Sequence, residues 1–259
     1  MSQDFNDAPT QKSNTALLIA LGGCGCAVLL FLVGAVLSFI LLPVILQTMG
    51  GSSEAARRMQ CTNNMKQITL ALHNYYDANK CLPPAYTVDE NGNPLHSWRV
   101  LLLPYLEQQY LYDQIRLDEP WDSEYNKQFH SQRMSCYRCP SATGDTLGMT
   151  CYSVIVGEET PFGDPTTTLT FGDISDGLSN TIFLVERKTP VCWMDPTQEI
   201  TFEEACKGIN VFGNEMGSNH SGGMNVSMFD GSVHFISETV HPGNLRAFFT
   251  RAGGESVVP

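Results

Sequence analysis

One continuous apolar segment dominates the hydropathy pattern of the chain. Residues 16–46 contain no charged side chain, and the nearest charges are Lys12 before them and Glu54 after them. A membrane-spanning helix needs about 20 consecutive apolar residues to cross roughly 30 Å of hydrocarbon. The pattern therefore predicts a transmembrane helix over residues 15–47, which tethers the rest of the chain to the lipid bilayer.

Two short polar segments flank the predicted span. Residues 1–14 are rich in Asn, Gln, Asp and Ser, a composition that predicts a disordered tail. Residues 48–53 contain the pair Gly50-Gly51, which predicts a hinge. The remaining residues, 54–259, are then one head domain, because about 200 residues suffice for a core of useful size.

An amphipathic helix is predicted directly after the hinge, over residues 54–79. Ser53 can cap it, and Glu54 places a carboxylate in the first turn, where the helix dipole favours negative charge. Apolar side chains then recur at spacings of three and four, which puts them on one face. We expect this face to pack on the sheet of the head itself, and the alternative is a seam for a partner helix. The apolar positions are Cys61, Met65, Ile68, Leu72 and Tyr75.

Short extended elements follow the helix. β-branched and aromatic residues dominate from residue 135 onward and predict strands at 150–156 and 181–185. Asn91-Gly92 and Asp230-Gly231 predict turns, the second a two-residue β-hairpin turn between alternating strands. The predicted fold class is α+β, a transmembrane helix followed by the amphipathic helix packed on an antiparallel sheet with short helices and long loops. Short helical segments are expected at 97–102 and 202–206 and from residue 242.

One loop of the head is rich in oxygen ligands. Asp173, Asp176 and Asn180 lie close together in the sequence, just before the strand predicted at 181–185. Calcium takes six to eight oxygen ligands from loops of this kind. The segment lacks the full spacing of an EF-hand, so a turn before the strand is favoured, and a calcium ion is the alternative.

Seven of the nine cysteines lie beyond the predicted span. This many suits a compartment in which disulfides persist, and the odd number leaves at least one cysteine free or paired between molecules. Disulfides are expected among Cys136, Cys139 and Cys151, or between Cys192 and Cys206. The connectivity cannot be read from the sequence.

Zinc is the alternative interpretation of the first three of these cysteines. The motif Cys136-x-x-Cys139, with His130 and Cys151 nearby, has suitable ligand types. A single CxxC is moderate evidence, and a second paired motif is missing from the sequence. Disulfides are therefore favoured over a zinc site.

Two large function classes find no support in the sequence. The motifs GxSxG, HExxH, the P-loop and GxGxxG are all missing, so no enzyme class is indicated. The formal net charge is -12, and Lys and Arg are nowhere concentrated, which argues against nucleic-acid binding. We therefore expect a non-enzymatic protein without a cofactor.

Several motifs, in order, resemble one bacterial family. They are EAARRMQCTNNMKQITLALHNYYDANKCLPPAY at 54–86, LHSWRVLLLPYLEQ at 95–108, ISDGLSNTIFLVE at 174–186 and HSGGMNVSMFDGSVHFIS at 220–237. The last contains the H-X9-DG signature, here His220 with Asp230 and Gly231. Over roughly residues 54–255 the chain is similar to the pseudopilin-like bacterial proteins labelled domain of unknown function 1559.

The resemblance implies an N-terminal helix packed on an antiparallel sheet, with the head outside the cytoplasmic membrane. Members usually begin with a short leader followed by Gly-Phe-Thr-Leu-x-Glu, which a prepilin peptidase cuts. This sequence lacks that motif, so cleavage and filament assembly are not expected. Lys12 against Arg57, Arg58 and Lys66 favours a cytoplasmic head by the positive-inside rule. The resemblance and the cysteines favour the outside, and we prefer the outside.

The predicted role is therefore a single-pass protein of the cytoplasmic membrane that serves envelope structure, assembly or interaction, with protein partners or with copies of itself. In this interpretation Asp230 is a turn residue and His220 hydrogen-bonds across the preceding loop. The alternative is an extracytoplasmic ligand-binding, metal-binding or catalytic domain. That alternative requires His220, Asp230 and the loop at 173–180 to converge in space.

Overall fold

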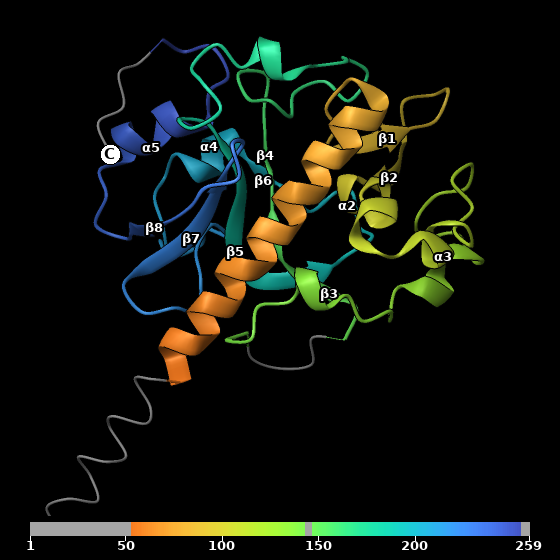
Figure 1. Cartoon of the computed structure of the whole chain (residues 1–259), viewed down its shortest axis with the longest axis horizontal. Helices are drawn as coiled ribbons and strands as arrows, with labels where there is room; N and C mark the ends of the chain where they lie inside the picture. The colour runs from red at the N-terminus through yellow and green to blue at the C-terminus, as the bar shows by residue number, and fades with distance from the viewer. Residues whose placement is uncertain (1–52, 143–146, 255–259) are drawn as a thin grey trace, which may run out of the picture. The chain divides into compact units, whose positions relative to one another are not determined.

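The computed structural model describes residues 53–142 and 147–254 (Figure 1). The predicted tail and transmembrane helix, and the hinge up to residue 52, lie outside these residues. The compact unit that forms the head begins at Glu54. Within the described ranges, no helix has both the length and the apolar character that crossing a bilayer requires.

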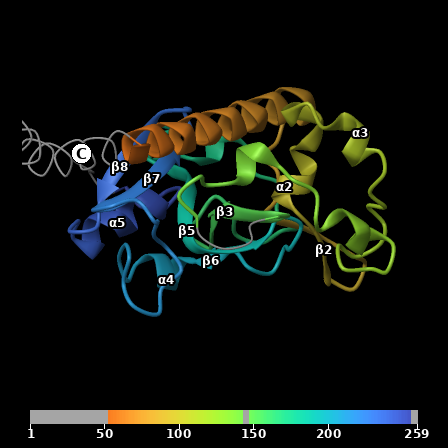
Figure 2. The same ribbon diagram turned by 90° about the horizontal axis from the view of Figure 1, so that it is seen from below.

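A long helix runs over residues 53–79 and lies across one face of the main sheet (Figures 1 and 2). The prediction that its apolar stripe packs on the head's own sheet is confirmed, since the first four stripe positions are 0% exposed. Thr69 Oγ1 on the same face lies 2.6 Å from Ser227 Oγ in the sheet. The stripe is therefore not a surface for a partner helix. Its fully buried positions are Cys61, Met65, Ile68 and Leu72.

The main sheet has four antiparallel strands in the order β3-β5-β7-β8. Val226 on β7 pairs with Val185 on one side and with His234 on the other. An α+β fold with an antiparallel sheet is thus confirmed. The strands are β3 (Met149–Ser153), β5 (Ile182–Cys192), β7 (Gly223–Met228) and β8 (Val233–Ser237).

Two pairs of short strands lie outside the main sheet. The strand predicted at 150–156 is divided, because β4 leaves the main sheet and pairs in parallel with β6. The strand predicted at 181–185 extends to Cys192, since its second half still pairs with β3. The minor strands are β1 (Tyr86–Val88), β2 (Pro94–Ser97), β4 (Ile155–Val156) and β6 (Ile200–Thr201).

Short helices complete the fold at the predicted places. Ser97 caps α2, accepting a hydrogen bond from Arg99 N through its hydroxyl, and Pro242 begins α5. The α-helices are α2 (Trp98–Leu101), α3 (Gln109–Tyr112), α4 (Phe202–Ala205) and α5 (Pro242–Phe249), and the 3-10 turns are η1 (Leu103–Leu106), η2 (Asn126–Phe129), η3 (Ser135–Tyr137) and η4 (Phe171–Asp173).

The two faces of the main sheet differ in what they bury. Alternate residues of β7, among them Met224 and Val226, point into an apolar core shared with α4 and α5. The residues between them, Asn225 and Ser227, are buried on the side of the long helix, where Ser227 meets Thr69. Figure 2 shows the long helix on one side of the sheet and α4 and α5 on the other. The helix side therefore holds buried polar groups that need partners.

The hairpin between β7 and β8 differs from the prediction. Its turn has three residues, Phe229 to Gly231, because Met228 N donates to Ser232 O at 2.9 Å and Gly231 N donates to Met228 O at 3.1 Å. Three-residue loops combine a type I turn with a last residue at positive φ, and Gly231 has φ +90°. Phe229 is fully buried in the core below the long helix, and its N–H donates to Thr181 O at 3.1 Å.

Candidate metal centre

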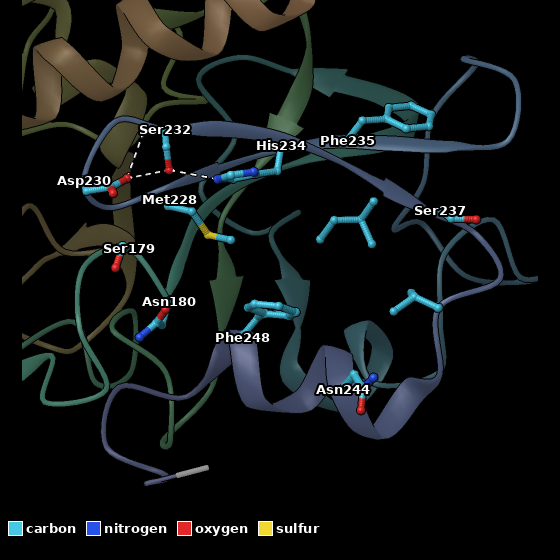
Figure 3. Close-up of a pocket in the computed structure, with 12 residues that line it drawn as sticks. Ser179, Asn180, Met228, Asp230, Ser232, His234, Phe235, Ser237, Asn244 and Phe248 are labelled. Atoms are coloured by element: carbon cyan, nitrogen blue, oxygen red, sulfur yellow. Dashed lines mark hydrogen bonds between the residues drawn. The ribbon is translucent and has the colours of Figure 1, made fainter. Parts of the chain in front are cut away.

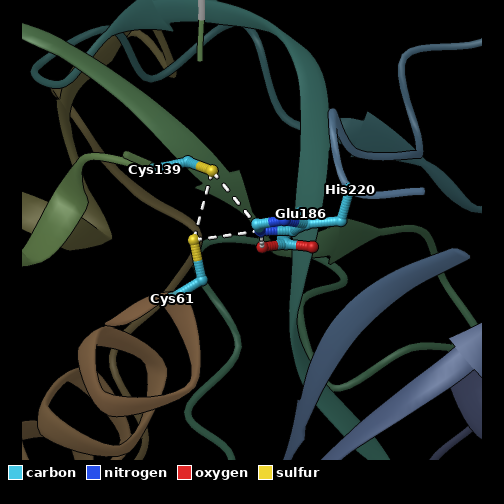
Figure 4. A group of neighbouring side chains, drawn as sticks. All are labelled: Cys61, Cys139, Glu186 and His220. Atoms are coloured by element: carbon cyan, nitrogen blue, oxygen red, sulfur yellow. Dashed lines mark hydrogen bonds and ion pairs between the residues drawn. The ribbon is translucent and has the colours of Figure 1, made fainter. Parts of the chain in front are cut away.

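Four side chains with metal-binding atoms converge between the long helix and the sheet (Figure 4). Cys61 comes from the long helix, Cys139 from the loop after η3, Glu186 from β5 and His220 from the loop before β7. One potential ligand atom from each lies within 4.8 Å of the others. All four residues are at most 3% exposed, so the cluster is enclosed.

The contacts within the cluster are close. The two sulfur atoms, Cys61 Sγ and Cys139 Sγ, are 3.1 Å apart. His220 Nε2 lies 3.3 Å from Cys61 Sγ, 3.7 Å from Cys139 Sγ and 3.3 Å from Glu186 Oε1. One imidazole nitrogen therefore faces two thiols and a carboxylate at once. This donor set could hold a metal ion, or the two thiols could be oxidised to a disulfide.

The backbone around His220 fixes the direction of its ring. Ser218 Oγ accepts a hydrogen bond from His220 N at 3.0 Å and donates one to Gly223 O at 2.7 Å, which ties the loop to the start of β7. On the far side of the ring, His220 Nδ1 lies 2.5 Å from Glu54 Oε1. Glu54 is in the first turn of the long helix and also pairs with Arg57 at 2.7 Å. The first helical turn is thus linked to the loop before β7.

Two of the other three donors, Glu186 and Cys139, are also held by hydrogen bonds. Glu186 Oε2 accepts from Asn225 N at 2.8 Å, and Glu186 Oε1 accepts from Asn225 Nδ2 at 3.1 Å. The loop that carries Cys139 is bound to the long helix by Asn64, whose Nδ2 donates to Arg138 O at 2.8 Å. These two donors are therefore positioned by hydrogen bonds in which side chains take part.

The electrostatics of the metal-free cluster follow from these contacts. The hydrogen bond from Cys61 lowers the pKa of the Cys139 thiol to about 6, although burial opposes the shift. The same hydrogen bond, together with burial, raises the pKa of Cys61. For His220, burial lowers the pKa, but hydrogen bonds to Cys139, Glu186 and Glu54 outweigh it and raise the pKa to about 10. These two shifts favour a deprotonated Cys139 beside a protonated His220.

Of the zinc ligands considered from the sequence, the structure brings only Cys139 into the cluster. Cys136 packs in the core below the long helix, and the His130 ring stacks on Trp121 with centroids 4.9 Å apart. Cys151 is buried beside Cys61 and Cys139 but is not one of the four clustered donors. The CxxC motif therefore correctly indicated the segment that carries Cys139, but the other ligands considered with it were wrong.

The expected disulfides are not present among the described residues, where all seven cysteines are free thiols. Cys192 packs against the core on the helix side, and Cys206 packs against the core under α4 and α5. The sheet thus separates these two thiols. The number of cysteines in the sequence indicated pairing, but their positions in the fold do not bring Cys192 and Cys206 together.

The oxygen-rich loop is used for turns. Asp173 Oδ2 accepts from Thr170 N and from Thr170 Oγ1, both at 2.7 Å. Asp176 accepts from the backbone N–H groups of residues 253 and 254 at 2.7 and 2.9 Å, and Asn180 Nδ2 donates to Asp176 O at 2.9 Å. The donors grouped closely enough to share a metal, among the described residues, do not include these side chains.

The H-X9-DG signature does not form a single site. His220 precedes β7 and Asp230 follows it, and the six residues of β7 span roughly 17 Å at about 3.3 Å per residue. Asp230 instead meets the loop at 173–180, since its N–H donates to Leu178 O at 3.1 Å. The joint site of His220, Asp230 and this loop is therefore not formed.

Asp230 lies at the rim of a groove of about 640 Å³ between β8 and α5 (Figure 3). Its carboxylate accepts from Ser232 N and Ser232 Oγ, and Ser232 Oγ contacts His234 Nε2. Phe248 and Met228 make much of the floor apolar. The side chain of Asp230 thus supports the turn.

Two members of the cluster were not recognised from the sequence. Cys61 was assigned to the apolar stripe of the helix. Its burial agrees with that assignment, but its thiol is also one of the four clustered donors. Glu186 ends the run Ile-Phe-Leu-Val-Glu, in which a lone carboxylate follows four buried residues. A buried carboxylate needs a charged or hydrogen-bonding partner. A lone Glu at the end of an apolar strand was therefore the sequence signal that could have indicated a polar site here.

The structure thus defines an α+β head in which one long helix is held against an antiparallel sheet at an enclosed cluster of sulfur, nitrogen and oxygen donors. The chain belongs to the protein family of unknown function DUF1559, whose family model matches residues 53–168 and 193–243, more than half of the chain. Cys61, Cys139 and His220 lie in the matched segments, and Glu186 lies between them. No curated protein and no solved structure matches the chain.

Proposed function

We propose that the protein is a non-enzymatic, single-pass protein of the cytoplasmic membrane whose head serves envelope structure, assembly or interaction. The observation that carries this proposal is the enclosure of the donor cluster. A catalytic metal or nucleophilic site keeps an open position for the substrate, whereas all four clustered residues here are at most 3% exposed. Their contacts join the long helix to the sheet, which suits a rigid head.

The proposed anchor rests on the sequence. Residues 16–46 carry no charge, and a run of this length is sufficient to cross a bilayer. Gly50-Gly51 lies between this run and the long helix of the head, so the proposed link between the two parts is short. The partners of the protein are then the bilayer and other envelope proteins or further copies of itself, and not nucleic acid.

The resemblance to pseudopilin-like proteins supports a head on the outer side of the membrane. The cysteines no longer add to that argument through disulfides, because those in the described residues are free thiols. The stripe from Cys61 to Leu72 is buried, so any partner contacts a different surface of the head.

Protease accessibility in spheroplasts tests this proposal. Protease added to intact spheroplasts should digest the head while a cytoplasmic control protein survives. After the spheroplasts are lysed, the control protein should be digested as well. Deleting residues 16–46 should move the head from the membrane fraction to the soluble fraction. A head that survives in intact spheroplasts, or a deletion variant that stays with the membrane, would contradict the proposal.

A further inference from the structure

We propose that Cys61, Cys139, Glu186 and His220 bind one Zn²⁺ ion, and that this ion fastens the long helix to the sheet. The ligands are two thiolates, one carboxylate oxygen of Glu186 and Nε2 of His220 (Figure 4). The inference goes beyond the proposed membrane anchoring, because it concerns only the interior of the head. It holds on whichever side of the membrane the head lies.

The spacing of the donors fits a tetrahedral zinc site. With Zn–S of about 2.3 Å and Zn–N or Zn–O of about 2.0–2.1 Å, the ligand atoms of a tetrahedral site lie about 3.8 Å apart for S to S, 3.6 Å for S to N and 3.4 Å for N to O. His220 Nε2 lies 3.3 and 3.7 Å from the two sulfur atoms and 3.3 Å from Glu186 Oε1. The sulfur atoms, at 3.1 Å, need to separate by about 0.7 Å to reach the tetrahedral distance when the ion enters.

The surrounding hydrogen bonds are those that a metal-binding histidine and carboxylate need. A zinc-bound imidazole donates its other N–H to a carboxylate or a carbonyl, which fixes the tautomer and the ring orientation. His220 Nδ1 meets Glu54 Oε1 at 2.5 Å in this role. Glu186 is oriented by Asn225 N and Nδ2 in the same way. Nε2 of His220 and Oε1 of Glu186 are thereby directed toward the two sulfur atoms.

Burial favours a cation among these acidic groups. An enclosed carboxylate is costly unless it is paired or binds a metal, and Glu186 is 1% exposed. Two thiolates and one carboxylate around a divalent cation leave a single net negative charge, and Glu54, on the other side of the His220 ring, is balanced by its own pairing with Arg57 at 2.7 Å. Mixed sulfur and nitrogen donors in a closed tetrahedron favour zinc over the harder divalent ions.

A disulfide between Cys61 and Cys139 is the competing state. It requires about 2.05 Å between the sulfur atoms, against the 3.1 Å observed, and it needs an oxidant. It also leaves the convergence of His220 and Glu186 on the two sulfur atoms without a function. The competing state and the zinc site differ in metal content and in mass, so one preparation can separate them.

The direct test is metal analysis of the full-length protein extracted in detergent. We expect one zinc per chain by mass spectrometry of the metal after dialysis. The zinc absorption fine structure should show two sulfur neighbours at about 2.3 Å and two nitrogen or oxygen neighbours at about 2.0–2.1 Å. Replacement by Co²⁺ should give the thiolate charge-transfer band and the visible bands of a tetrahedral site. These measurements need no variant, so they stand even where a substitution impairs folding.

Variants then identify the ligands. Cys61→Ser, Cys139→Ser, Glu186→Gln and His220→Gln should each weaken zinc binding at least 100-fold. Cys151→Ser is the matched control, because Cys151 is a buried cysteine in the same small apolar cluster as Cys61 and Cys139 but is not one of the four donors. It should keep one zinc per chain.

Each of the following results would overturn the proposal. One is a full-length protein that binds no zinc when reduced and supplied with the ion. Another is a mass 2 Da below that of the reduced chain, with a peptide that links Cys61 to Cys139. A third is a fine structure with four sulfur neighbours or none. The fourth is a loss of zinc in Cys151→Ser as large as in the ligand variants.

Discussion

The two ends of β7 carry the two halves of one sequence signature and do different things. Before the strand, His220 is 3% exposed and faces two thiols and a carboxylate. After the strand, the exposed Asp230 accepts hydrogen bonds from the N–H and hydroxyl of Ser232, and Gly231 adopts φ +90°. The first end supplies a ligand, and the second shapes a turn.

The difference shows that residues that recur together in a motif need not share a site. The strand between them is the common cause of their fixed spacing, because six residues of β7 set a distance of roughly 17 Å between the two ends. A hairpin in the correct register is what brings His220 under the long helix. The strand β7 thus positions both the turn and the proposed metal centre, although the two do not contact each other.

The largest effect is expected from removing the metal or its histidine. A zinc ion at about 1,000 times its dissociation constant stabilises the folded state by about 4 kcal/mol. Chelation, or His220→Gln, should lower the free energy of unfolding by about this amount in urea denaturation followed by circular dichroism. Adding zinc back should restore the chelated wild type but not the variant.

The control for this prediction is chelation of the His220→Gln variant itself. A chelator should leave its stability unchanged, since the variant holds no ion to lose. Equal destabilisation of wild type and variant by the chelator would show that the ion lies elsewhere, and the assignment of the first end of β7 would fail.

Substitution of Gly223, at the start of β7, should destabilise the protein nearly as much as removal of the metal. A Cβ at Gly223 would lie 2.1 Å from the carbonyl oxygen of Ile236 on β8. The strands must separate to admit it, and such overpacking costs about 3 kcal/mol. We expect Gly223→Ala to unfold at lower urea concentration and to bind zinc more weakly, because the loop of His220 is tied to Gly223 through Ser218. Unchanged stability would show that β7 and β8 are not as closely paired here.

Substitution of Glu54 should weaken zinc binding although Glu54 is not itself a zinc ligand. Its carboxylate orients His220 from 2.5 Å, and removing such a partner weakens metal binding about 10- to 100-fold. Glu54→Gln should show this loss in competition with a zinc-binding dye, while the fine structure of the bound ion stays at two sulfur atoms. Glu203→Gln, also in the first turn of a helix, is the matched control and should bind zinc as the wild type does.

A substitution in the turn after β7 should reduce the free energy of unfolding by a smaller amount and should not affect zinc binding. A Cβ at Gly231 meets nothing within 4 Å, so only the positive φ of the residue is unfavourable. That conformation costs an L-residue about 1–2 kcal/mol. Gly231→Ala should therefore lose about 1 kcal/mol of stability and keep one zinc per chain. A loss of zinc in this variant would mean that both ends of the signature form one site after all.

The smallest effect concerns a buried histidine outside the cluster. Burial lowers the pKa of His96, although hydrogen bonds to the Arg116 and Glu119 backbone oppose the shift. The neutral ring is therefore favoured in the folded state, and its contribution to stability is present above about pH 6.5, the pKa in the unfolded chain. It is lost as the pH falls through the lower pKa of the folded state. His96→Gln should reduce the loss of stability on acidification, as measured by urea denaturation from pH 7 to pH 5.

The local elements of the fold were largely predictable. The helix at 53–79, the cap at Ser97, the short helix at 202–205 and the turn at Asn91-Gly92 follow from spacing, capping and positive φ, all of which act over a few residues. The length of the β7–β8 turn was not predicted correctly, because Phe229 is drawn into the core below the long helix. That packing is a tertiary effect which the pair Asp-Gly does not reveal.

The candidate site was predictable only in part. His220 and Cys139 were recognised as chemically capable, but each was given the wrong neighbours. Cys61 lies 78 residues from Cys139 in the chain, and a helix stripe explains its burial equally well. Glu186 is one residue in a strand that is buried on both faces, so alternation gave no sign of which core its side chain enters.

By itself, the sequence determined the family, the α+β class, the long apolar run before the head and the helix that follows it, because these depend on local periodicity and on ordered motifs. Only the tertiary structure decided that the two ends of the signature separate, that the oxygen-rich loop closes on residues 253–254, and that Cys61 and Cys139 meet each other. Sulfur, nitrogen and carboxylate groups from four distant segments come together because the helix packs on one particular face of the sheet. That choice depends on the whole core and is not encoded in any one segment.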